Sequence, residues 1–190
     1  LGRPFGPWLK VVVFNAVRTE RELTFDPAWI EELAARLDRA PQVEIQLKRG
    51  RAKNELTRFR YDAVLRFDPN PEDPQEEPLR LAWGDPEATP AALRRRLGAS
   101  GGPGGDAPRQ VIVSEVPNAR LVAEIEAVRR LAASRAVNPE GDVASLRATL
   151  ATTRPAGLEP EEMWALGSTT PYRVKVCGSS TELDRFEVIL

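Results

Sequence analysis

The sequence predicts an α/β protein whose sheet ends in an antiparallel hairpin, and three stretches of the chain carry that prediction. Residues 43–48 (VEIQLK) and 58–67 (RFRYDAVLRF) alternate apolar and polar side chains, which is the two-residue period of half-buried strands. Residues 9–17 (LKVVVFNAV) form a continuous valine-rich run, which is typical of a strand covered by helices on both faces. A helical pattern at 24–38 lies between these stretches, so helix and strand alternate along the chain.

Local signals define the first helix and the hairpin connector. Asp26 is expected to cap the helix, and Pro27 suits its first position. A core-facing stripe is expected along one side of this helix, formed by Trp29, Ile30, Leu33, Ala34 and Leu37. The polar connector from Gly50 to Thr57 is longer than a tight turn, so we expect it to present a contact surface.

The second half of the chain is expected to extend the same sheet or to build a small layer against it. The predicted elements are a strand at 79–83, a helix at 89–97, a strand at 109–117, helices that begin after Asn118, after Asp142 and at Pro160, and a hairpin of 171–176 with 185–190. In that hairpin, Val176 and the apolar residues before it are expected opposite Phe186, Val188 and Leu190.

Two segments of biased composition predict linkers and divide the chain into three parts. Residues 68–78 (DPNPEDPQEEP) combine prolines with acidic side chains, which favours an extended, solvated segment. The glycine cluster at 98–107 follows a helical pattern instead of a strand, so we interpret it as a flexible linker and not as a cofactor loop. The predicted parts are a hairpin-bearing sheet at 1–68, the linkers around a short helix at 69–108, and an α+β subdomain at 109–190.

Composition argues against several classes of function. The 190 residues include 27 basic and 28 acidic side chains, so neither nucleic acid nor a membrane is expected as a partner. The chain has no histidine and a single cysteine, Cys177, which removes a Cys/His metal site, an internal disulfide and histidine-based catalysis. Neither an apolar run of about 20 residues nor a signal-peptide pattern occurs, so a cytoplasmic setting is expected. The start without Met and the strand-like end lead us to expect a segment of a longer protein.

Several stretches of the chain resemble one known family. They are DPAWIEELAARL (26–37), VEIQLKRG (43–50) and NELTRFRYDAVL (54–65), with looser matches at VPNARL (116–121) and PEEMWAL (160–166). The chain is similar to the closing segment of the S-adenosylmethionine-dependent methyltransferase domains embedded in nonribosomal peptide synthetases and polyketide–peptide hybrids. The match is almost without gaps from Phe25 to Arg66.

This resemblance implies a partial Rossmann-type mixed sheet with an antiparallel terminal hairpin and a C-terminal α+β extension. Methyltransferases of this fold hold the cofactor in a glycine-rich turn after the first strand, and an acidic residue after the second strand binds the ribose. Neither feature precedes Leu9, so we expect this chain alone to bind no cofactor. The run VVVFNAV (11–17) resembles the family's central strand, and RTEREL (18–23) then stands where the family has a further helix and strand, which implies an internal deletion.

The resemblance also places polar residues of the hairpin near the methyl acceptor or a carrier-protein arm. These candidates for substrate or interdomain contact are Asn54, Glu55, Arg58, Arg60, Tyr61 and Asp62. A structural role is the competing interpretation, because Arg60 and Asp62 share one face of their strand. Their charges could pair with Glu44 or Lys48 across the ladder. Tyr61 shares the apolar face with Phe59, so it is expected to lie in the core.

Asn118 and Arg120 complete the candidate contact residues. Asn118 is expected to cap the helix that follows it, and Arg120 is expected to be solvated or to contact a neighbouring domain. Cys177 is expected to be a packing residue with a near-normal pKa. The helix dipole explains a cluster of carboxylates without a metal, namely Glu159, Glu161 and Glu162. The sequence assigns no catalytic, cofactor-binding or metal-binding residue.

Two functions are left open, together with a weaker third. The first is a non-catalytic methyltransferase-like domain that positions neighbouring adenylation, condensation or carrier-protein domains of an assembly line. The second is the C-terminal portion of an active enzyme that transfers methyl from S-adenosylmethionine to an amine or carbon of a tethered aminoacyl substrate. The third is a free-standing module that binds an acidic partner through Arg94, Arg95 and Arg96, which otherwise form a solvated helix face.

Overall fold

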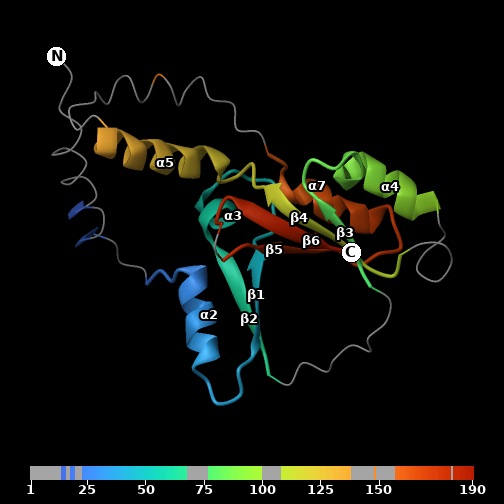
Figure 1. Ribbon diagram of the computed structural model, residues 1–190, viewed down its shortest axis with the longest axis horizontal. Helices are drawn as coiled ribbons and strands as arrows, with labels where there is room; N and C mark the ends of the chain where they lie inside the picture. Colours follow the sequence, from blue (N-terminus) through green and yellow to red (C-terminus); the bar gives the residue numbers. More distant parts are fainter. Residues whose placement is uncertain are drawn as a thin grey trace. The chain divides into compact units, whose positions relative to one another are not determined.

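The described strands form one mixed six-stranded sheet, with helices beside it (Figure 1). The computed structural model describes residues 14–15, 18–19, 23–67, 77–99, 108–137, 148, 157–180 and 182–190. The strand order is β2-β1-β5-β6-β4-β3. The strands are β1 (Gln42–Leu47), β2 (Tyr61–Arg66), β3 (Leu79–Ala82), β4 (Val111–Pro117), β5 (Lys175–Gly178) and β6 (Arg185–Ile189). The predicted α/β class is confirmed, and the arrangement is consistent with a partial Rossmann-like fold.

Both predicted hairpins are present. β1 pairs antiparallel with β2 along its whole length, and β5 pairs antiparallel with β6. Val176 lies opposite Val188, as predicted, whereas Tyr172 and Val174 precede β5 and lie outside its ladder. The local two-residue period therefore predicted strand pairing correctly and overestimated strand length.

The second half of the chain extends the sheet that the first hairpin begins. β1 pairs with β5 through Gln46 and Cys177, and β4 pairs antiparallel with β6. β3 lies parallel to β4 at the far edge, so the strand predicted at 79–83 is an integral part of the same sheet.

Side chains from helices complete the hydrophobic core that the strands begin. The described helices are α2 (Pro27–Ala35), α3 (Glu55–Phe59), α4 (Pro90–Ala99), α5 (Val122–Val137) and α7 (Pro160–Trp164), with 3-10 turns η1 (Pro86–Ala88) and η2 (Ala165–Ser168). Leu93 and Leu97 of α4 and Met163 of α7 are fully buried in one cluster with the strand residues Val113 and Val188. Burial of such side chains is worth about 1.5–3 kcal/mol each, so this cluster dominates the stability of the sheet.

The strand predicted at 9–17 is wrong at the two residues where it can be checked. Phe14 and Asn15 are helical, and Phe14 is 59% exposed, so it is not a strand residue covered on both faces. The rest of that run lies outside the described residues, as do residues 68–76, most of 98–107 and the predicted cap Asp142.

The first helix forms as predicted, but its apolar stripe is not deeply buried. The Asp26 carboxylate accepts a hydrogen bond from the N–H of Ala28 at 2.9 Å, which confirms the cap. α2 packs against β1 and β2, yet Trp29 remains 45% exposed and Leu33 40% exposed. Helix amphipathicity identified the correct element and overestimated its burial.

The hairpin connector contains a helix that the strand pattern concealed. α3 occupies Glu55–Phe59, and β2 begins only at Tyr61. Phe59 is 54% exposed and Phe67 is 51% exposed, so neither belongs to the core face that the alternation predicted. The second half of the connector is thus a helical turn, whereas residues 50–54 have no regular secondary structure.

A bulge in β4 explains its burial pattern. Val113 pairs with Val188 and Val116 with Phe186, so β4 uses one more residue than its partner between these pairs. Glu115 occupies the extra position with φ of 61°, a left-handed conformation that is uncommon for residues other than glycine. The bulge lets both valines face the core, where both are fully buried.

The chain divides into two compact units. One comprises residues 1–25 and 123–155, and its described part contains most of α5, which begins at Val122 and not directly after Asn118. The other comprises residues 26–122 and 156–190 and contains the whole sheet. Among the described helices, none is long and apolar enough to cross a membrane.

Candidate functional site

The predicted contact residues meet around the connector between β1 and β2. Arg120 follows β4 in the sequence, but its side chain reaches the connector and is only 3% exposed. The expectation that Arg120 is solvated is therefore wrong. The structure instead makes it the buried centre of a polar cluster whose rim is solvent-accessible, since the Arg49 side chain is 67% exposed and that of Glu159 is 26% exposed. The cluster, which we call the Arg120 cluster, is formed by Arg49, Gly50, Thr57, Arg120, Glu159 and Glu161.

Arg120 holds three backbone carbonyls of the connector region. Its guanidinium donates to the carbonyl oxygens of Lys48 at 2.6 Å, Gly50 at 2.6 Å and Thr57 at 3.1 Å. Its Nε also forms an ion pair with the Glu159 carboxylate. A planar guanidinium supplies this many donors in a fixed geometry, which a lysine cannot do. Arg120 thereby fixes both ends of the connector to the segment that precedes α7.

Glu161 provides a second attachment for the same connector. Its Oε2 lies 3.1 Å from a terminal nitrogen of Arg49, and its Oε1 accepts the Gly50 N–H at 2.5 Å. Gly50 has φ of 132°, and a Cβ there would lie 3.1 Å from Cγ2 of Thr57, so glycine suits this close approach. Glu161 is 8% exposed, and the dipole explanation offered from sequence missed this specific role.

Opposing effects set the protonation of Glu161. Burial opposes ionisation, but the hydrogen bonds from Arg49 and the Gly50 N–H, with the charges of Arg49 and Arg120, hold the pKa of Glu161 below its ordinary value. The carboxylate is therefore charged near neutral pH, as its ion-pair role requires. Arg49 also stacks over Trp164, with its guanidinium carbon 5.0 Å from the ring centroid.

The candidate residues of α3 build the helix itself. The Asn54 side chain accepts the N–H of Thr57 at 3.1 Å in a capping box. Glu55 pairs with Arg60 at 3.1 Å. Arg58 Nε donates to the carbonyl of Arg120 at 3.2 Å, and its guanidinium lies 5.1 Å from the Phe59 ring centroid. These interactions order the connector from within.

Other polar residues of the hairpin interact outside the Arg120 cluster. Asp62 forms an ion pair with Lys48 on the facing strand, which is one of the cross-strand pairs considered from sequence. Glu44 instead pairs with Arg66 at 3.5 Å and Lys175 at 3.4 Å. Tyr61 is half-buried, and burial, followed by the charge of Asp26, raises its pKa above the ordinary value. A tyrosine shifted in this direction is a poorer general base near neutral pH.

Asn118 forms hydrogen bonds with the backbone at and after Arg120 and with that of Asp184. It is 2% exposed, its side chain accepts the N–H of Arg120 at 3.1 Å, and its own N–H donates to the carbonyl of Asp184 at 2.7 Å. Its carbonyl accepts the N–H of Val122, the first residue of α5. The predicted cap is wrong, because α5 begins only at Val122 and the Asn118 side chain instead stabilises the turn before the helix.

A pocket of about 390 Å³ lies next to the Arg120 cluster, where β1 and β5 meet. Its lining combines charged and apolar side chains, including Glu44, Gln46, Leu47, Lys48, Trp164 and Lys175. The full lining has three basic side chains (Lys48, Arg49 and Lys175) and two acidic ones (Glu44 and Asp62), and each lysine pairs with one of these carboxylates.

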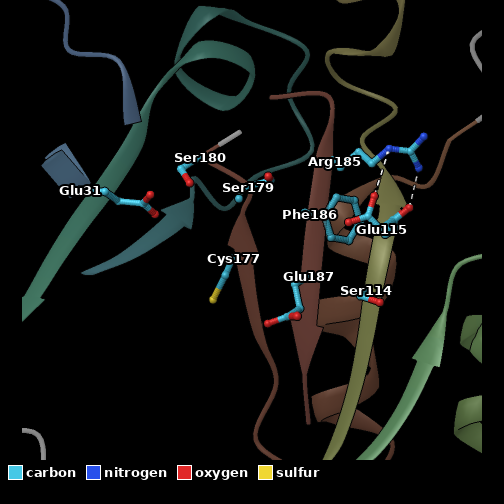
Figure 2. A pocket seen from close by; sticks show the side chains of 10 residues that line it. Glu31, Ser114, Glu115, Cys177, Ser179, Ser180, Arg185, Phe186 and Glu187 are labelled. Atoms are coloured by element: carbon cyan, nitrogen blue, oxygen red, sulfur yellow. Dashed lines mark hydrogen bonds and ion pairs between the residues drawn. The ribbon is translucent and has the colours of Figure 1, made fainter. Parts of the chain in front are cut away.

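A second pocket lies over β4, β5 and β6 and has a volume of about 240 Å³ (Figure 2). Arg185 reaches the bulge and donates to the carbonyl of Glu115 at 2.8 Å, whereas Cys177 and Glu187 project from neighbouring strands. Burial, followed by the negative charge of Glu44, raises the pKa of Cys177 to about 12. This finding supports a packing role for Cys177, although its pKa is far from the near-normal value expected.

The arginines of α4 lie apart from the Arg120 cluster. Arg94 Nε donates to the Thr169 hydroxyl at 3.2 Å, Arg96 pairs with Glu87, and Arg95 is exposed. In the part of the chain that the structure describes, no group of three or more histidine, cysteine or acidic residues is placed to hold a metal ion.

Comparisons with known proteins show which proteins this chain is similar to. No protein-family model matches the chain. It is 33% identical over 173 residues to chondramide synthase of Chondromyces crocatus, which covers 87% of this chain and 4% of that synthase. It is 36% identical over 126 residues to cyclosporin synthetase of Tolypocladium inflatum, covering 64% of this chain and 1% of the synthetase. It is 42% identical over 67 residues to the nonribosomal peptide synthetase TES of Alternaria alternata, covering 35% of this chain and 1% of that protein.

The relatives are nonribosomal peptide synthetases. The similarity supports an origin of this chain in a nonribosomal peptide synthetase. The chain spans only a few per cent of the length of these relatives, so the similarity concerns one segment of a much longer protein.

Proposed function

We propose that this chain is a methyltransferase-like interaction module of a nonribosomal peptide synthetase that performs no methyl transfer by itself. The peptide-synthetase setting rests on the relatives. The non-catalytic role rests on the resemblance of residues 25–66 to the closing segment of such domains and on the structural use of the polar residues in this region.

The observation that carries the proposal is the use of Arg120 as a structural residue. Its guanidinium donates hydrogen bonds to three backbone carbonyls and forms an ion pair with the Glu159 carboxylate. Hydrogen bonds of Arg58 and Asn54 in turn stabilise α3. Residues that the resemblance would place beside a substrate thus maintain a rigid surface. This arrangement supports a role in positioning neighbouring domains more than a role in chemistry.

The proposed partners are adjacent adenylation, condensation or carrier-protein domains of the same assembly line. The long relatives support the existence of such neighbours. A cytoplasmic location remains an expectation from the sequence.

The alternative is that the chain is the C-terminal portion of an active N- or C-methyltransferase acting on a carrier-tethered aminoacyl substrate. The 390 Å³ pocket favours this candidate, because it lies beside the hairpin that the resemblance associates with the methyl acceptor. In that case S-adenosylmethionine would be held mainly by sequence outside this chain, and the pocket would contribute to acceptor binding.

Calorimetric titration of the 190-residue chain with S-adenosylmethionine tests the proposal. We expect no saturable heat up to millimolar ligand. Saturable binding would contradict a non-catalytic module. Methyl transfer to a carrier-bound aminoacyl group by a longer protein that contains this segment would favour the alternative.

A further inference from the structure

The connector between β1 and β2 concentrates positive charge in a chain that is nearly neutral overall. Residues 49–60 carry five basic side chains and a single acidic one, Glu55; the basic residues are Arg49, Arg51, Lys53, Arg58 and Arg60. The whole chain has a formal net charge of −1. Glu55 pairs with Arg60 and Arg49 pairs with Glu161, whereas Arg51 and Lys53 are exposed in front of α3. Clustering of one sign on one surface attracts partners of the opposite sign.

Two large apolar side chains lie among these charges. Leu56 is 58% exposed and Phe59 is 54% exposed, and their spacing of three residues places them on the same side of α3. Arg58 stacks over the Phe59 ring at 5.1 Å, which orients the ring at the surface. We call the surface formed by Arg51, Lys53, Leu56, Arg58 and Phe59 the α3 knuckle.

The α3 knuckle is ordered before any partner arrives. Arg120 binds the carbonyl of Gly50, directly before the knuckle, and that of Thr57 within α3, and the Asn54 cap fixes the first turn of the helix. Arg58 is attached through its Nε to the carbonyl of Arg120. Binding at a preorganised surface avoids the cost of ordering a loop, which is one of the main penalties of association.

We infer that the α3 knuckle is a docking surface for an acidic, amphipathic helical face of another protein domain. The basic side chains would match its carboxylates, and Leu56 and Phe59 would enter its apolar stripe. Nucleic acid fits less well, because Arg58 already lies over the Phe59 ring and Leu56 offers a base no aromatic surface for stacking. This inference rests on the proposed interaction role and adds the chemistry of the partner.

The test uses the full 190-residue chain and a fluorescein-labelled synthetic peptide that forms an amphipathic helix with leucines on one face and glutamates on the other. Fluorescence anisotropy gives the dissociation constant at 50 and 300 mM salt. A peptide with the same composition but scrambled faces is the first control, and a single-stranded 20-mer oligonucleotide is the competing ligand.

Matched variants assign the binding to the α3 knuckle. Phe59→Ser is paired with Phe67→Ser, a change of the same type at 51% exposure on the far end of β2. Arg51→Glu is paired with Arg95→Glu, a charge reversal on α4. We expect Phe59→Ser to weaken peptide binding about tenfold, which corresponds to a modest interface contact. Arg51→Glu should weaken it about five-fold at 50 mM salt and less at 300 mM, since exposed charges are screened.

The inference is overturned by any of three results. They are no saturable binding of the amphipathic peptide, equal losses in the knuckle and control variants, or tighter binding to the oligonucleotide. Circular dichroism and the urea midpoint confirm that each variant is folded. None of these results involves S-adenosylmethionine, so failure here is distinguishable from failure of the proposed function.

Discussion

Replacement of Arg120 by alanine is the perturbation that most directly probes the Arg120 cluster. The substitution removes hydrogen bonds to the carbonyls of Lys48, Gly50 and Thr57 and leaves the Glu159 carboxylate without its partner. Breaking a fully buried ion pair by removing one member costs about 3–5 kcal/mol, and a smaller part of that applies here because the Glu159 side chain left behind is 26% exposed. Each carbonyl left unsatisfied costs a further ~1 kcal/mol or more, offset where water enters the new cavity. We therefore expect a loss of about 4 kcal/mol in the free energy of unfolding.

Urea unfolding followed by tryptophan fluorescence measures this loss. With a slope of about 2 kcal/mol per molar urea, the midpoint should fall by about 2 M. Arg120→Lys should lose about half as much, because a lysine retains the charge near Glu159 but lacks the planar set of donors. Arg95→Ala, at an exposed position, should stay within about 0.5 kcal/mol of the wild type. A loss below 1 kcal/mol in Arg120→Ala would refute the structural role assigned to this residue.

Three further predictions follow from the same geometry. The pKa of Glu161 is lowered in the folded state, so its stabilising contribution is present above the ordinary value of 4.5 and is lost as pH falls through the lower folded pKa. The urea midpoints of Glu161→Gln and the wild type should therefore converge in acid and separate as pH rises. Midpoints that differ by the same amount at every pH would contradict this. Gly50→Ala should cost about 1 kcal/mol more than Gly84→Ala, because both have positive φ but only at Gly50 would a Cβ lie 3.1 Å from Cγ2 of Thr57. Equal thermal unfolding losses would count against this contact. Alkylation of Cys177 by iodoacetamide at pH 8 should be about a thousandfold slower in the folded chain than in denaturant, because a pKa raised from 9.0 to about 12 lowers the fraction of reactive thiolate by that factor. Similar rates in the two states would show that the thiol is not shielded.

Elements with strong local signals were predictable from the sequence. The Asp26–Pro27 start located α2, and the two-residue alternation located β1, β2 and the pairing of β5 with β6. The connector helix was missed because residues 50–57 were interpreted as a polar loop and residues 58–59 as the start of the following strand, although Leu56 and Phe59 are three residues apart, as on one face of a helix. Its capping box, with Asn54 and Thr57 three residues apart, was the signal that could have revealed α3.

The Arg120 cluster depends on contacts between segments that are distant along the chain. Arg120 lies 39 positions from Glu159 and 72 from Lys48, and Arg49 lies 112 from Glu161. Neither propensity nor periodicity carries information at such separations, so the sequence placed Arg120 at a helix start without its partners. The exposed stripe of α2 shows a related limit, because amphipathicity does not reveal how much of a face is covered by the rest of the fold.

Amide NMR spectra of the 190-residue chain, recorded during addition of S-adenosylmethionine, test the central claim most directly. The claim is that the polar residues around Arg120 maintain structure and do not form a cofactor or substrate site. We expect no saturable shift of the amide signals of Gly50, Thr57 or Arg120 up to millimolar ligand. Saturable shifts that gather at these residues or line the pocket beside Trp164 would contradict it.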